Sequence, residues 1–104
     1  MVAYVINDMV VTDPALLEDY KKLSPATVAR HGGRFLARGG RVEALEGDWS
    51  PSRIVVIEFP SVEQARAWID SPEYEPAKQL RQRAATSRLI VVEGVPELRA
   101  DPAP

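Results

Sequence analysis

Runs of large apolar side chains alternate along the chain with polar, turn-forming segments. The most concentrated run, RIVVIEFP at residues 53–60, is apolar on both faces when it is read as a strand, which is typical of a central strand in a sheet. Residues 2–11 and 87–93 share this two-faced pattern and predict two more strands. These three runs predict a sheet with apolar groups on both faces.

A fourth strand is predicted between these runs, over residues 34–38 and 41–46. Gly39 and Gly40 interrupt it and permit either a bulge within one bent strand or a tight hairpin. We expect one bent strand, followed by an exposed turn that carries Trp49.

Two helical segments separate these strands. Asp13 and Pro14 are typical of a helix start, and Gly32 and Gly33 of a left-handed helix end. Pro25 lies between them, so we expect either a kink or a second, separately capped segment.

The second helical segment begins with a capping box, in which Ser61 is followed three residues later by Gln64. Its inward stripe includes Trp68, which we expect in the core. A turn at residues 70–72 ends it, and a further helix is predicted at residues 73–85.

This order of elements is that of an α+β protein with the ferredoxin-like βαββαβ arrangement, in which helices cover one face of a four-stranded antiparallel sheet. We expect residues 1–94 to form a single domain, because 104 residues suffice for one core. Residues 95–104 are rich in proline and alanine and predict a flexible C-terminal tail.

Composition excludes several classes of site. The chain has no cysteine, which rules out disulfides, thiolate metal sites and a cysteine nucleophile, and His31 is its one histidine. We therefore expect no metal and no cofactor. A net charge of -2 argues against a nucleic-acid partner. Asn7 and Asp8 interrupt the first apolar run too early for a signal or membrane-spanning segment, so we expect a cytoplasmic protein.

Several blocks of the sequence together resemble the bacterial family named domain of unknown function 1330: HGGRFLARGG, LEGDW, RIVVIEFPS, SPEY and VEG. The resemblance covers nearly all of residues 2–94. It implies the dimeric α+β barrel fold, in which two ferredoxin-like protomers pack sheet against sheet. That wider group includes cofactor-free antibiotic-biosynthesis monooxygenases, muconolactone-type isomerases and haem enzymes. The family itself implies no agreed activity and no catalytic residue.

Two residues are the candidates for catalysis. Glu58 lies among apolar side chains, which could raise the pKa of a general base, although an ion pair with an arginine such as Arg81 or Arg88 is the alternative. His31 follows the first helix, where it could bind a ligand or could only stabilise the helix C-terminus.

Four further residues are candidates for ligand binding: Arg34, Trp49, Tyr74 and Arg81. Arg34 could hold a carboxylate or could belong to the solvated side of a strand. Trp49, on its turn, could cover a pocket or pack into a partner, and Tyr74 could face the sheet or be packed with its hydroxyl satisfied.

These observations favour a homodimer that binds a small organic molecule in a mostly apolar cavity between sheet and helices, with oxygenase-like or isomerase-like chemistry as one hypothesis. The alternative is a non-catalytic interaction module with a filled interior. A haem-binding version ranks third, because His31 supplies at most one imidazole ligand. A cavity beside Glu58 would favour ligand binding, whereas a packed interior would favour the module.

Overall fold

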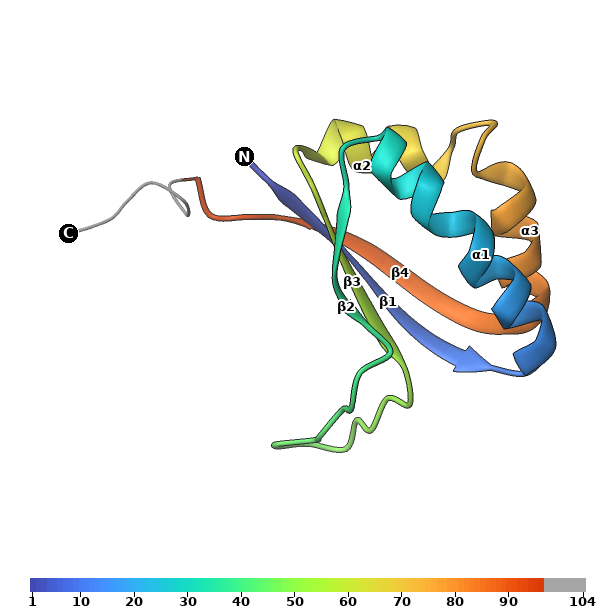
Figure 1. Ribbon diagram of the computed structural model, residues 1–104. Coiled ribbons are helices and arrows are strands. Elements are labelled where there is room, and N and C mark those ends of the chain that lie inside the picture. The colour runs from blue at the N-terminus through green and yellow to red at the C-terminus, as the bar shows by residue number, and fades with distance from the viewer. Residues whose placement is uncertain (97–104) are drawn as a thin grey trace.

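The computed structural model describes residues 1–96 and has an α+β architecture (Figure 1). The elements in chain order are β1 (Ala3–Val11), α1 (Pro14–Arg30), β2 (Arg34–Arg38), β3 (Ile54–Phe59), α2 (Val62–Ile69), α3 (Glu75–Ala84) and β4 (Ala85–Glu93). The strands form one antiparallel sheet in the order β2-β3-β1-β4. The helices lie on one face of this sheet and leave the other face open. The ferredoxin-like prediction is confirmed. The predicted flexible tail lies mostly outside the described residues.

The first helix begins and ends as its sequence predicts. The Asp13 carboxylate accepts the backbone N–H of Leu16 at 3.2 Å. At the other end, the N–H of Gly33 bonds the carbonyl of Val28, and Gly32, with φ at 79°, bonds that of Ala29. This pair of bonds is a Schellman motif, which satisfies carbonyls that the helix leaves free.

Helix α1 runs unbroken through Pro25, so the alternative of a second capped segment is wrong. Proline has no N–H to give to the carbonyl four residues earlier, which belongs to Lys21. The guanidinium of Arg38, on β2, donates to this carbonyl at 3.0 Å instead. A tertiary hydrogen bond thus replaces the helical one.

The predicted strand at residues 41–46 is wrong. The chain leaves the sheet after Arg38 and returns at Ile54, and residues 39–53 form a projecting arm (Figure 1). A strand here needs a partner, but the residues that return to β3 include Pro51, which has no N–H for a ladder. Gly39, with φ at 75°, directs the chain away from the sheet, and the only register shift in the described β2–β3 pairing lies earlier, between Phe35 and Ala37.

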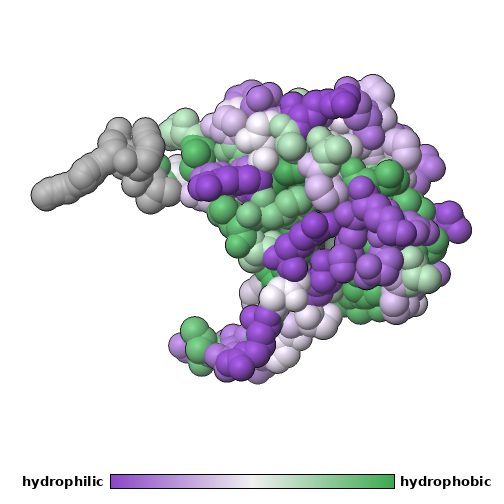
Figure 2. Space-filling model, in the orientation of Figure 1, coloured by the Kyte–Doolittle hydropathy of each residue, from purple (hydrophilic) through white to green (hydrophobic). Residues whose placement is uncertain are grey.

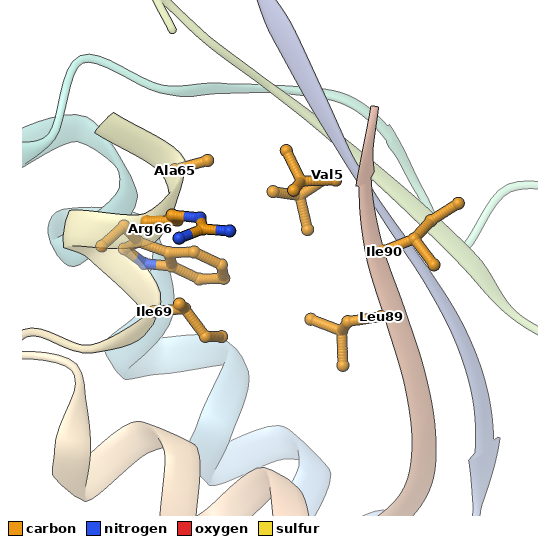
Figure 3. A pocket seen from close by; sticks show the side chains of 8 residues that line it. Val5, Ala65, Arg66, Ile69, Leu89 and Ile90 are labelled. Atoms are coloured by element: carbon orange, nitrogen blue, oxygen red, sulfur yellow. The ribbon is translucent and has the colours of Figure 1, made fainter. Parts of the chain in front are cut away.

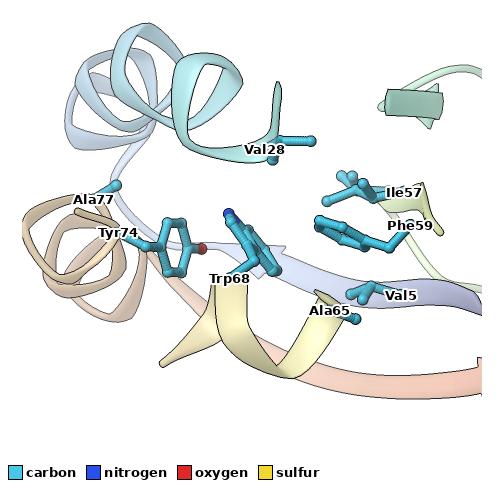
Figure 4. Packing of buried hydrophobic residues seen from close by; sticks show 9 residues of the cluster. Val5, Val28, Ile57, Phe59, Ala65, Trp68, Tyr74 and Ala77 are labelled. Carbon is cyan, nitrogen blue, oxygen red and sulfur yellow. The ribbon is translucent and has the colours of Figure 1, made fainter. Parts of the chain in front are cut away.

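The core packs between the sheet and the helices. Trp68 lies between Phe59 and Tyr74, with ring centroids 5.4 Å and 4.3 Å away (Figure 4). Its indole N–H donates to the Thr27 hydroxyl at 3.1 Å, so the one polar atom of the indole is satisfied in the interior. The core position expected for Trp68 is confirmed.

The open face of the sheet, opposite the helices, carries three rows of residues that are paired across β3, β1 and β4. The middle row is apolar and joins Val56, Ile6 and Ile90, with the side chain of Ile90 60% exposed. The two flanking rows each contain an ion pair, one between Arg34 and Glu58 and the other between Asp8 and Arg88.

Candidate functional site

His31 lies just after α1, where it contacts its own helix and the turn before α3. Its Nδ1 is 2.9 Å from the Thr27 carbonyl, and its Nε2 is 3.9 Å from a carboxylate oxygen of Glu73. These contacts fit a residue that stabilises the end of a helix.

Glu58 lies on the open face and forms an ion pair. Its carboxylate accepts from Nε of Arg34 at 2.7 Å. The partners expected from the sequence, Arg81 and Arg88, are wrong, because Arg81 is buried under the helices on the other face and Arg88 pairs with Asp8. Register explains the choice, since Arg34 and Glu58 are directly paired across β2 and β3. Arg34 and Glu58, which the sequence predicted as separate site residues, thus form an ion pair with each other.

Trp49, in the half of the arm that returns to β3, is 59% exposed and contacts the open face. Its indole N–H is 3.3 Å from the Asp8 carboxylate, which also accepts from Arg88 at 2.6 Å. A shallow hollow of about 360 Å³ lies beneath the arm, lined by these three residues with Ile6 and Ile90.

Tyr74 and Arg81 come together beneath the helices in a buried hydrogen-bond chain. Nε of Arg81 donates to the Tyr74 hydroxyl at 3.1 Å, and this hydroxyl lies 2.8 Å from that of Tyr20 on α1. Burial, and next the neighbouring Tyr74, raise the pKa of Tyr20 well above its ordinary value, so Tyr20 remains a neutral hydroxyl. The binding roles of Tyr74 and Arg81 remain predictions.

An apolar hollow of about 160 Å³ opens between α2 and β4 (Figure 3). Its lining comes from three elements and is apolar except for one arginine: Val5, Ala65, Arg66, Trp68, Ile69, Leu89, Ile90 and Val91. It arises because α2 has only eight residues and leaves the end of the nine-residue β4 uncovered, with Val91 38% exposed.

A smaller and more enclosed hollow of about 20 Å³ lies deeper, between the sheet and α1. We call it the interior hollow. Its polar lining comes from Asn7, Tyr20, Lys21, Ser24, Arg38 and Arg53. Three polar atoms here are buried without a hydrogen-bond partner among the described residues: Asn7 Oδ1, Ser24 Oγ and Arg53 Nε. Glu58 lines none of the three hollows. The apolar hollow and the interior hollow lie on the helix side of the sheet, whereas the Glu58 carboxylate lies on the open face.

Sequence reasoning missed the polar residues of the interior hollow, although a signal was present. Asn7 replaces an apolar residue at a helix-facing position of β1, between Val5 and Met9, and is 95% buried. Ser24 follows Tyr20 at helical spacing on the inward stripe of α1. A polar residue at a core position indicates either a structural network or a site.

The fold and these hollows define a ferredoxin-like α+β protein with a cavity between its sheet and its helices. The chain belongs to the family described as domain of unknown function (DUF1330), whose model matches residues 2–95. No curated protein matches the chain.

Two solved structures with the same fold are similar to this chain. A protein of unknown function from Rhodopseudomonas palustris, RPA0582, is 25% identical, with a TM-score of 0.73 over 90% of this chain and 82% of that one. SnoaB, a cofactor-independent oxygenase from Streptomyces nogalater, is 19% identical, with a TM-score of 0.59 over 95% of this chain and 97% of that one.

Two features are absent from the part of the chain that the structure describes. No group of three or more histidine, aspartate or glutamate side chains gathers within residues 1–96 in a way that could hold a metal ion. No helix in that range is long and apolar enough to cross a membrane.

Proposed function

We propose that the chain forms a homodimer and binds a small, mainly apolar organic molecule between α2 and β4. The observation that carries this proposal is the apolar hollow of about 160 Å³. A cavity of this size and lining resembles engineered apolar cavities that bind benzene. Burial of apolar ligand surface supplies the binding energy, and Arg66 at the lining offers one polar contact.

The open face supports the dimer. Its apolar middle row and the exposed Val92 need cover, because soluble monomers rarely leave a large apolar patch in water. Figure 2 shows the surface hollowed between the main body and the arm, with hydrophobic side chains along that hollow. A second copy is the occupant we propose, because an apolar row flanked on both sides by an ion pair of opposite charges complements itself under a two-fold axis.

The test of ligand binding uses toluene as the probe. We expect toluene to shift the amide resonances of Ala65 and Leu89, which line the hollow. Val91→Trp places a large side chain at the hollow and should weaken toluene binding about tenfold or more, since it occupies the space that the probe needs.

Val95→Trp is the matched control, because Val95 is exposed and does not line the hollow. It should leave toluene binding unchanged. Equal binding by both variants, or no binding by the parent protein, would remove the apolar hollow as a ligand site.

The second candidate function is a non-catalytic interaction module with a filled interior. The small size of the interior hollow, about 20 Å³, favours it, because that space holds about one water molecule.

Cofactor-independent oxygenase chemistry is the finer proposal, and the fold shared with SnoaB supports it. The fold alone does not define an activity, so the test is direct. Oxygen uptake with polycyclic phenols as probes should depend on the protein and persist after dialysis against a metal chelator. Absence of uptake with every phenol tried counts against this chemistry.

A further inference from the structure

Charge distinguishes the interior hollow from the apolar one. Three cationic side chains line it, from Lys21, Arg38 and Arg53, and no carboxylate does within the described residues. Lys21 is paired with Glu18 and Arg38 with a backbone carbonyl, whereas Nε of Arg53 is buried without a partner. A buried donor that lacks an acceptor is unfavourable, so an electron-rich oxygen at this point is favoured.

The hydroxyl of Tyr20 is a second donor at the interior hollow. It ends the chain of hydrogen-bonding groups that begins at Arg81 and passes through Tyr74. Arginine carries only donors, so the Tyr74 oxygen accepts from Arg81. The hydroxyls of Tyr74 and Tyr20 are 2.8 Å apart, and either can donate to the other. In the arrangement in which Tyr74 donates, the Tyr20 proton is available to the interior hollow that Tyr20 lines.

Ser24 completes the set of donors. Ser24 is 99% buried, and its hydroxyl lies close enough to that of Tyr20, one helical turn earlier on α1, to lower the pKa of Tyr20, although the two form no close hydrogen bond. The unpartnered oxygen of Asn7 is an acceptor and gives no hydrogen bond to an anionic oxygen, so the donors come from the other residues.

We propose that the interior hollow is a binding site for one anionic oxygen of a small organic acid, such as a carboxylate, phenolate or enolate, which receives hydrogen bonds from Tyr20, Ser24 and Arg53. Its volume of about 20 Å³ fits an oxygen-sized group and not a whole ligand. The rest of the molecule occupies the adjacent apolar hollow, which shares Val5, Trp68 and Leu89 with it, and in this respect the inference rests on the proposed function.

The test compares benzoate with benzyl alcohol, a neutral compound of similar size, in NMR titrations of the full chain that follow the side-chain Nε–H of Arg53. Benzoate should bind about tenfold more tightly or better, because hydrogen bonds to a charged acceptor are the strong ones. Tyr20→Phe and Arg53→Gln should each abolish most of this preference, and two variants guard against one that fails to fold.

Arg83→Gln is the matched control, since it removes the same charge from an exposed position on α3. It should keep the preference for benzoate. Equal binding of both probes, insensitive to Tyr20→Phe and Arg53→Gln, would overturn the anion site while leaving the apolar hollow intact. The absence of benzoate binding, with water alone in the interior hollow, would also overturn it. Benzoate binding that needs Arg53 in a protein that does not bind toluene would support the anion site and refute the apolar hollow.

Discussion

Tyr20 shows how burial affects a single ionisable group. Its hydroxyl lies between that of Tyr74 and the interior hollow, where a phenolate is poorly solvated and its pKa is raised from 10.0. The folded protein therefore holds this proton more tightly than the unfolded chain does. The stability that follows is fully present below pH 10 and is lost as pH rises above it.

The free energy of unfolding should reflect this difference. By pH 11, Tyr20 alone should have removed about 1.4 kcal/mol from the stability that the protein has below pH 9, because the phenol ionises near pH 10 in the unfolded chain and stays neutral in the folded one. Tyr20→Phe lacks this ionisation, so the stability gap between the two proteins should be constant from pH 7 to 9 and should change in favour of the variant above pH 10. Urea denaturation across this range measures it, and a gap that is independent of pH would contradict it.

Glu58 illustrates the opposite case, a charged group near water. The Glu58 side chain is 20% exposed, but that of its partner Arg34 is 72% exposed, so solvent screens the pair and its contribution is small. Glu58→Gln should change the free energy of unfolding by no more than about 1 kcal/mol in urea denaturation. A larger loss would indicate that the pair is buried in the assembled protein.

At the scale of elements, the arm depends on the residue at its start. Gly39 has φ at 75°, and an added Cβ would collide with Nη1 of Arg53. Gly39→Ala should therefore cost about 1–2 kcal/mol of stability through backbone strain, and should move the Arg53 side chain. Gly40→Ala is the matched control, because nothing lies within 4 Å of its Cβ position. Equal effects of the two substitutions in urea denaturation would contradict this account.

The elements that sequence predicts well are those set by local chemistry. The Asp13 cap, the Gly32 turn and the Ser61 N-cap, which is one half of the expected capping box, all hold in the structure, because each depends on residues within one helical turn. The strand at residues 41–46 was wrong because pairing depends on a distant partner, which local apolar content does not reveal.

The partner of Glu58 and the residues of the interior hollow could not be predicted for a related reason. The apolar residues on either side of Glu58 in the sequence suggested a carboxylate in an apolar site. Strand register instead pairs Glu58 with Arg34 on the open face. The interior hollow gathers Asn7 from β1, Ser24 from α1 and Arg53 from the end of the arm, and no spacing in the sequence brings them together.

At the scale of the whole molecule, we expect the open face of the sheet to form the interface of a homodimer. Two copies that pack through this face should bury on the order of 1,600 Å² or more in total. Light scattering coupled to size exclusion should report about twice the chain mass at micromolar concentration.

Val56→Lys tests this interface, because it puts a charge into the middle row of the open face. The variant should be monomeric or insoluble, since an unpaired charge at the centre of an interface is strongly unfavourable. A lysine at Gln82, exposed on α3, is the control and should leave the mass unchanged. A soluble wild-type monomer would exclude the sheet-to-sheet dimer.

The pairing of β1 with β4 has a consequence for synthesis. Every residue of β1, from Ala3 to Val11, pairs with a residue of β4, so strands from opposite ends of the described domain are joined. Until β4 has left the ribosome, β1 exposes apolar side chains and an unpaired edge, which are the features that promote aggregation of nascent chains. Completion of this sheet must therefore wait for β4 to be synthesised, and a chain arrested before Ala85 should remain sensitive to protease and bound to chaperones.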